Sequence, residues 1–164
     1  MLKVLVGIAT VGFTTLCDYL LSKKYRQRKQ FFRQFKEFNE RFLNEIAYYR
    51  RPVQEFAATY AYQGEFNELL QAFFVNLKER ELNERKILDL PTYSFLKEDE
   101  KLVISDYFLM LGKGDSASQK SYFSSIKEAL IKYQNESNAA SKKYEDLYIK
   151  LGFLCGLFIL ILII

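Results

Sequence analysis

An apolar run near the start of the chain is the feature that most constrains its fold. From Val4 to Leu21 the only charged side chain is Asp18. As a helix this run reaches about 27 Å, close to the hydrocarbon thickness of a bilayer. A cleaved signal peptide would need small residues after the run, and a lipoprotein signal would need one just before Cys17, where Leu16 stands. We therefore expect residues 1–22 to form a retained N-terminal transmembrane anchor.

A second apolar run, residues 151–164, closes the sequence. Its helical length of about 21 Å is, taken alone, more typical of a core helix or a partial insertion. The run has no polar face, however, and Lys150 can extend its ammonium toward water. We therefore predict a C-terminal transmembrane helix over 151–164, able to cross a locally thinned bilayer if residues 147–149 join it.

The two predicted anchors carry residues suited to membrane packing. Gly152 and Gly156 have the G-x-x-x-G spacing that allows two helices to approach closely. Cys17 and Cys155 each lie five residues inside the expected cytoplasmic interface, so we expect them at the same depth. Two alternatives stay open: the anchors pack as a pair, or each packs on a different membrane protein.

Basic residues follow the first apolar run directly. Between Ser22 and Lys36 there are seven Lys or Arg residues and no acidic one. Basic residues beside a span stay on the cytoplasmic side, so the middle of the chain is expected in the cytoplasm. We call the five nearest the membrane the basic collar: Lys23, Lys24, Arg26, Arg28 and Lys29. The alternative is a membrane-tethered scaffold that binds nucleic acid or anionic lipid through residues 22–36.

The middle of the chain predicts long helices. The sequence has only 7 Gly and 2 Pro, and apolar residues recur at steps of three and four. We predict an all-α fold, an antiparallel helical bundle over residues 23–150. Helices are expected up to about Arg51, over 52–62, 65–82 and 98–111, and from Asp115 onward, with a weak point at 134–143. The apolar stripe of the first helix comprises Phe31, Phe35, Phe38, Phe42, Ile46 and Tyr49.

Catalytic chemistry is not indicated. The chain has no His, which is the commonest general base, and no phosphate-binding loop of the Walker type. Its two Cys lie far apart, so neither a disulfide framework nor a metal knuckle is expected. The acidic residues 98–100 fit a solvated helix start. We expect no enzyme activity, no metal and no cofactor.

Three punctuation motifs stand out in the sequence. They are Glu45-Ile46-x-Tyr48-x-x-x-Pro52-Val53, then Leu111-Gly112-x-x-Asp115-x-x-x-Gln119, and finally Lys143-Tyr144-Glu145 followed by Leu151-Gly152-Phe153-Leu154-x-Gly156. Singly, each is ordinary helix punctuation by Pro, Gly and capping residues. In this order, between two apolar segments, they resemble the stage III sporulation protein AB family of endospore-forming bacteria.

The resemblance implies a fold and a role. The fold would be similar to the F-type platform domain of type II secretion and type IV pilus systems. The role would be that of an oligomeric platform in the channel complex linking mother cell and forespore, located in the mother-cell membrane. There the cytoplasmic face would meet a separate secretion-type ATPase and other channel proteins. The candidate corner or contact residues are Glu45, Tyr48, Pro52, Gly112, Asp115 and Gln119.

Overall fold

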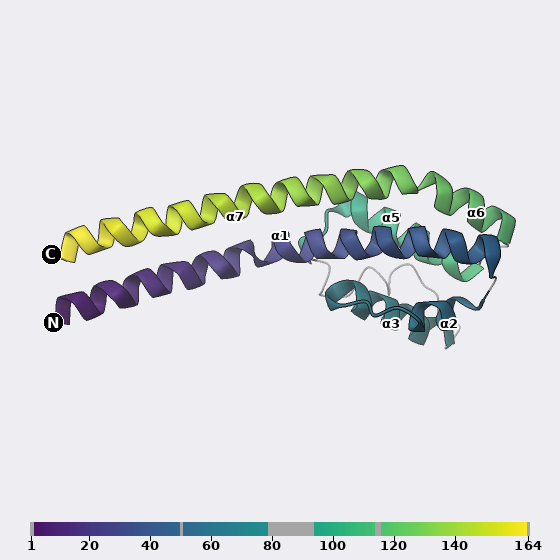
Figure 1. Ribbon diagram of the computed structural model, residues 1–164, viewed down its shortest axis with the longest axis horizontal. Helices are drawn as coiled ribbons and strands as arrows, with labels where there is room; N and C mark the ends of the chain where they lie inside the picture. Colours follow the sequence, from purple (N-terminus) through teal and green to yellow (C-terminus); the bar gives the residue numbers. More distant parts are fainter. Residues whose placement is uncertain (1, 50, 79–93, 114–115, 164) are drawn as a thin grey trace. The chain divides into compact units, whose positions relative to one another are not determined.

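The computed structural model describes residues 2–49, 51–78, 94–113 and 116–163. Within these ranges the chain forms helices and no strand, which confirms the all-α prediction (Figure 1). The helices are α1 (Leu2–Tyr48), α2 (Val53–Ala58), α3 (Gly64–Lys78), α5 (Glu98–Lys113), α6 (Ser116–Ser125) and α7 (Lys127–Ile163). The stretch between the helices expected over 65–82 and 98–111 falls mostly outside the described residues.

The chain divides into two compact units. The terminal unit comprises residues 1–26 and 136–164, and the central unit comprises residues 27–135. The central unit is thus shorter at both ends than the predicted bundle, whose limits of 23 and 150 stay a prediction. In the described part of the chain no helix has the length and hydropathy needed to cross a bilayer. The two predicted transmembrane spans are therefore not confirmed.

Phenylalanines of α1 form the centre of the central unit. Phe31, Phe35, Phe38 and Phe42 are fully or almost fully buried. Their rings meet those of other helices mostly edge to face, an arrangement that aromatic pairs prefer. The partners are Phe56 of α2, Phe66 of α3, Tyr107 and Phe108 of α5, and Phe123 of α6. The predicted stripe is confirmed as far as Ile46, which is partly buried against this core.

The second helix is shorter than predicted. It ends at Ala58, where the amides of Thr59 and Tyr60 bond three residues back and tighten the last turn. Gly64 does not end this helix as expected; it begins α3, with a φ of +59° that favours glycine. The segment before it is held by Gln34, which donates to the carbonyl of Gln63 (2.7 Å) and accepts its amide (2.7 Å).

The last helix is also divided differently from the prediction. A break separates α6 from α7 at Ile126, whereas the expected weak point at 134–143 is continuous helix. Asn39 explains the break, because its side-chain amide donates to the carbonyl of Phe123 (3.1 Å), which a continuous helix would use itself. The side-chain oxygen Oδ1 of Asn39 in turn accepts a hydrogen bond from the Tyr107 hydroxyl (3.1 Å). Residues 134–143 stay helical, with Ser137 and Ser141 buried.

The fragment 25–150 is expected to fold by itself as a helical domain. Each fully buried Phe or Leu of its core contributes about 1.5–3 kcal/mol, and no metal or cofactor is expected to be needed. Far-UV circular dichroism should show a helical spectrum with a cooperative thermal transition, and chelators should leave the melting temperature unchanged. A spectrum dominated by strand would contradict the fold assignment.

Candidate functional site

The first punctuation motif, residues 45–53, is held by an ion pair between a buried carboxylate and a partly exposed guanidinium. The carboxylate of Glu45 is only 3% exposed, and Arg51 donates to it from Nε (2.8 Å), Nη2 (2.7 Å) and the backbone amide (3.2 Å). Pro52 follows as the residue that caps α2, with φ −56° and ψ 139°. Its fixed φ and missing N–H suit this position. Glu45 and Pro52 therefore fix the turn between α1 and α2.

Two tyrosines stand out from this turn. Tyr48 is 79% exposed and Tyr49 is 70% exposed, and the Arg51 guanidinium lies 5.5 Å from the centre of the Tyr49 ring. The assignment of Tyr49 to the core stripe was wrong, because α1 ends at Tyr48 and the next residue no longer follows the helical face. We call Tyr48, Tyr49 and Arg51 the aromatic end of the central unit.

The second punctuation motif, residues 111–119, joins α5 to α6 at the same end of the central unit (Figure 1). Gln119 of α6 donates to the carbonyls of Met110 (3.2 Å) and Leu111 (3.3 Å) and so ties α6 to the last turn of α5. Either Gly112 or Gly114 is expected to end this helix in a left-handed conformation. Gly112 lies inside α5, which continues to Lys113, and Gly114 lies outside the described residues. The predicted cap, Asp115, lies outside the described residues.

Glu45→Gln is expected to make stability less dependent on pH. Hydrogen bonds from Arg51 hold the pKa of Glu45 below its ordinary value. A lowered carboxyl pKa contributes stability above the unfolded pKa, and the contribution is lost as the pH falls through the folded pKa. The variant should therefore melt below the wild type near pH 7, and by a smaller margin near pH 3, below the unfolded pKa of about 4. An equal difference at both pH values would mean that the ionised form has no role.

One member of the basic collar belongs to the core. The Arg28 guanidinium is buried against the carboxylate of Glu100 in α5, with Nε 3.2 and 3.1 Å from its two oxygens. Glu100 also accepts the backbone amide of Lys97 (3.0 Å), as in the carboxylate half of a capping box. The prediction that residues 98–100 form a solvated helix start was therefore wrong for Glu100. It is confirmed for Glu98, whose side chain is 87% exposed. Arg28 cannot serve as a free surface cation.

The other collar residues are nearer to the expected arrangement. Lys23, Lys24 and Lys29 are exposed. Arg26 folds back on α1, where it donates to the Ser22 hydroxyl (2.8 Å) and the Tyr19 carbonyl (2.8 Å). The collar thus provides three exposed lysines, whereas the sequence suggested five equivalent cations.

The last part of α7 exposes apolar side chains in the terminal unit. Gly152 and Gly156 are buried, and Cys155 between them is exposed. The side chain of Cys17 lies outside what is described, so the common depth of the two cysteines stays a prediction. The exposed large apolar residues of this segment are Leu147, Ile149, Leu151, Phe153, Leu154, Leu157, Phe158 and Ile161.

The described residues hold no group of His, Cys, Asp or Glu that could bind a metal ion.

Over residues 3–164 the chain matches the family model described as stage III sporulation protein AB. The chain belongs to the stage III sporulation protein AB family. This membership confirms the resemblance carried by the three motifs and connects the chain with sporulation. No curated protein and no solved structure matches it.

Proposed function

We propose that this stage III sporulation protein AB family member is a non-enzymatic, membrane-anchored platform. Its place would be the channel complex between mother cell and forespore, in the mother-cell membrane, with the central unit in the cytoplasm. There it would dock a separate secretion-type ATPase. The observation that carries the docking proposal is the aromatic end, an exposed surface on a tightly packed helical unit.

The composition of the aromatic end supports a protein contact. Tyr and Arg are enriched among residues that dominate binding energy, because they combine a large apolar area with a polar group. Tyr48 and Tyr49 are exposed, whereas the core of the central unit is rich in buried aromatic rings. The Glu45–Arg51 ion pair holds the turn that carries them, so little ordering cost is expected on binding.

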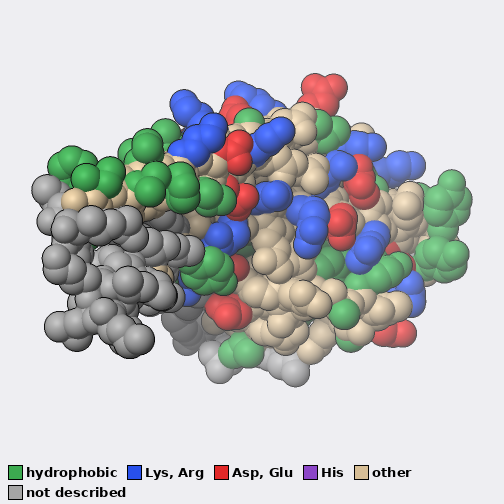
Figure 2. Space-filling view, turned by 60° about the vertical axis from the view of Figure 1, so that its left-hand side comes forward, with side chains coloured by type: hydrophobic (Ala, Val, Ile, Leu, Met, Phe, Trp, Pro, Cys, Tyr) green, Lys and Arg blue, Asp and Glu red, His purple; other side chains and the backbone are tan. Residues whose placement is uncertain are grey.

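The apolar surface of α7 supports membrane attachment. Between Leu147 and Ile161, eight of the large apolar side chains that the structure describes are exposed in the terminal unit. Figure 2 shows hydrophobic side chains gathered at the surface near the chain termini. Contiguous apolar surface of this kind marks contact with a membrane or another protein. The exposed collar lysines favour a cytoplasmic central unit.

The alternative of nucleic-acid binding through residues 22–36 gains no support. Its phenylalanines, Phe31, Phe32 and Phe35, are fully buried in the core and therefore cannot stack on bases. Arg28 is buried in an ion pair. The remaining lysines fit a membrane surface without further assumptions.

Fractionation of sporulating cells tests the membrane proposal. The full chain should stay in the membrane pellet after alkaline carbonate extraction, and protease should cleave its central unit only in inside-out vesicles. The variant Phe153→Asp/Phe158→Asp should be released in larger part, because charges within a span are costly. Recovery of the wild-type chain in the carbonate supernatant would contradict membrane anchoring.

A further inference from the structure

Three tyrosines of the terminal unit form a continuous aromatic stack between α1 and α7. The rings of Tyr25 and Tyr144 lie 4.1 Å apart at an angle of 14°, and Tyr148 continues the stack with its ring 6.2 Å from that of Tyr144. All three side chains are half-buried. Tyrosine has an apolar ring and a polar hydroxyl, so it concentrates where an apolar phase meets water.

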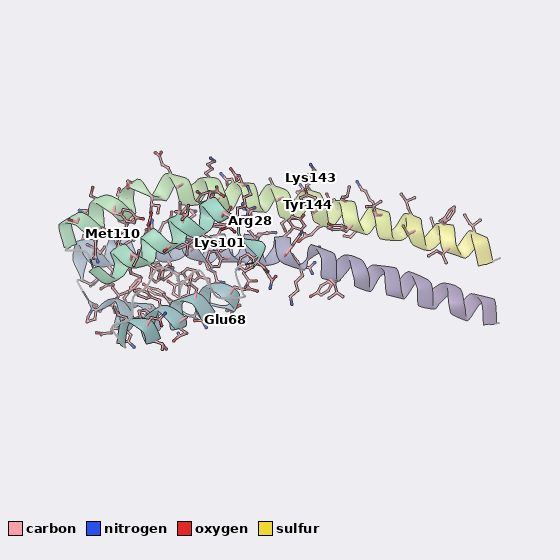
Figure 3. All side chains as sticks on the ribbon, turned by 180° about the vertical axis from the view of Figure 1, so that it is seen from behind. Arg28, Glu68, Lys101, Met110, Lys143 and Tyr144 are labelled. Carbon is pink, nitrogen blue, oxygen red and sulfur yellow. The ribbon has the colours of Figure 1, made fainter. Side chains whose placement is uncertain are left out.

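Lysines lie beside this stack on both helices. The Lys24 ammonium is 5.0 Å from the centre of the Tyr25 ring, and the Lys143 ammonium is 5.9 Å from the centre of the Tyr144 ring. Figure 3 shows Lys143 and Tyr144 next to each other on α7. The neighbouring Lys23 and Lys142 are also exposed. The cations therefore come from both helices of the terminal unit.

Among the described side chains, acidic groups do not balance this group of lysines. Glu145 accepts a hydrogen bond from the Ser141 hydroxyl (2.9 Å) and is half-buried, so on α7 the exposed acid beside the stack is Asp146. Four exposed lysines, Lys23, Lys24, Lys142 and Lys143, stand against it. The described surface around the tyrosine stack therefore carries more positive than negative side chains.

Side chains along α7 follow the polarity order of half a bilayer. Lys142 and Lys143 come first, and Tyr144 and Tyr148 follow with the exposed Asp146 between them. Lys150 is the last charged residue, and exposed apolar residues continue from Leu151 to Ile161. Figure 2 shows Lys and Arg side chains bordering the hydrophobic ones. Cationic groups suit anionic headgroups, tyrosines suit the interface, and aliphatic side chains suit the acyl region.

We propose that the tyrosine stack Tyr25–Tyr144–Tyr148 and the lysines around it form a headgroup-level site for anionic phospholipid. The lysine ammonium groups bind the lipid phosphates, while the stacked rings pack on the glycerol and upper acyl region. The occupant is a membrane lipid because the exposed apolar surface begins directly beside the stack. The site rests on the proposed membrane attachment, and it sets how deep the terminal unit sits.

Depth of insertion can be measured because the chain has no Trp. The full chain carrying Tyr148→Trp, Phe158→Trp or Tyr48→Trp is placed in vesicles whose lipids bear bromine at different acyl depths. Position 148 should be quenched by shallow bromine and position 158 by deep bromine, since ten helical residues span about 15 Å. Position 48 should not be quenched. Deep quenching at position 148 would overturn the headgroup-level assignment.

Lipid preference is measured with the Tyr148→Trp chain in mixed phosphatidylcholine and phosphatidylglycerol vesicles, with bromine on one lipid class at a time. Brominated phosphatidylglycerol should quench the tryptophan fluorescence more strongly than its fraction in the mixture predicts. Adding Lys24→Gln/Lys143→Gln should reduce the preference by about fivefold per lysine, whereas Lys120→Gln, an exposed lysine of the central unit, should leave it unchanged. Equal quenching by both lipids would overturn the site but not the attachment. Failure of the chain to insert in either lipid would overturn both.

Discussion

Glu100→Ala is expected to lower the free energy of unfolding of fragment 25–150 by about 3–5 kcal/mol. The carboxylate is fully buried, pairs with the buried Arg28 guanidinium and accepts the Lys97 amide at the start of α5. Its removal leaves a buried cation and an unsatisfied helix-end amide, and both are costly. Urea unfolding followed by circular dichroism measures the loss.

Two matched variants separate the buried pair from a general surface effect. Glu98→Ala removes an exposed carboxylate that pairs with Lys101, three residues on, and should change stability by less than about 0.5 kcal/mol. Arg28→Met/Glu100→Leu replaces both charges by apolar groups and should regain most of the loss. If Glu100→Ala costs no more than Glu98→Ala, the pair does not hold α1 to α5.

Phe38→Ala is expected to cost a similar amount, about 3–5 kcal/mol. The side chain is fully buried, and its ring centre lies 5.5–6.3 Å from those of five other rings, which come from α1, α2, α3, α5 and the segment before α3. Because so many elements share this ring, the cavity cannot close without moving several helices. The same urea titration of the fragment measures this loss of unfolding free energy.

A matched apolar truncation controls for the Phe38 result. Leu102→Ala removes a side chain that is 57% exposed, and it should change stability by less than about 0.5 kcal/mol. Comparable losses for the two variants would mean that the core is not centred on α1.

The parts of the fold that depend on periodicity could be predicted from the sequence. Apolar residues at steps of three and four placed Phe31, Phe35, Phe38 and Phe42 on one face, and the structure buries all four. Pro52 marked a real break, because its ring fixes φ wherever it stands. These signals are local, so a single sequence contains them.

The features that were missed depend on partners far along the chain. Arg28 looked like a collar residue and Glu100 like a solvated acid, since nothing local shows that residues 72 positions apart meet. Asn39 decides where α6 ends and α7 begins, by taking the Phe123 carbonyl 84 positions away. Polar residues that act through such contacts have no periodic signature.

The candidate site was only partly predictable for the same reason. The first punctuation motif pointed to Glu45, Tyr48 and Pro52, but only the burial of each side chain shows its role. Glu45 is buried and holds Arg51, whereas Tyr48 is an exposed ring. Glycine often ends a helix, so the sequence offers Gly112 and Gly114 equally for the end of α5, and only the structure shows that α5 continues past Gly112. The family resemblance needed the order of three motifs rather than any single residue.

The central claim is that the aromatic end docks a secretion-type ATPase. The most direct measurement is the dissociation constant between that purified ATPase and the full chain in detergent or lipid nanodiscs. Wild type should bind, and Tyr48→Ser/Tyr49→Ser should bind about thirtyfold more weakly, as expected for hot-spot residues, with an unchanged melting temperature. Tyr19→Ser, an exposed tyrosine of the terminal unit, should bind like wild type. No binding by wild type, or equal binding by the double variant, would contradict the account.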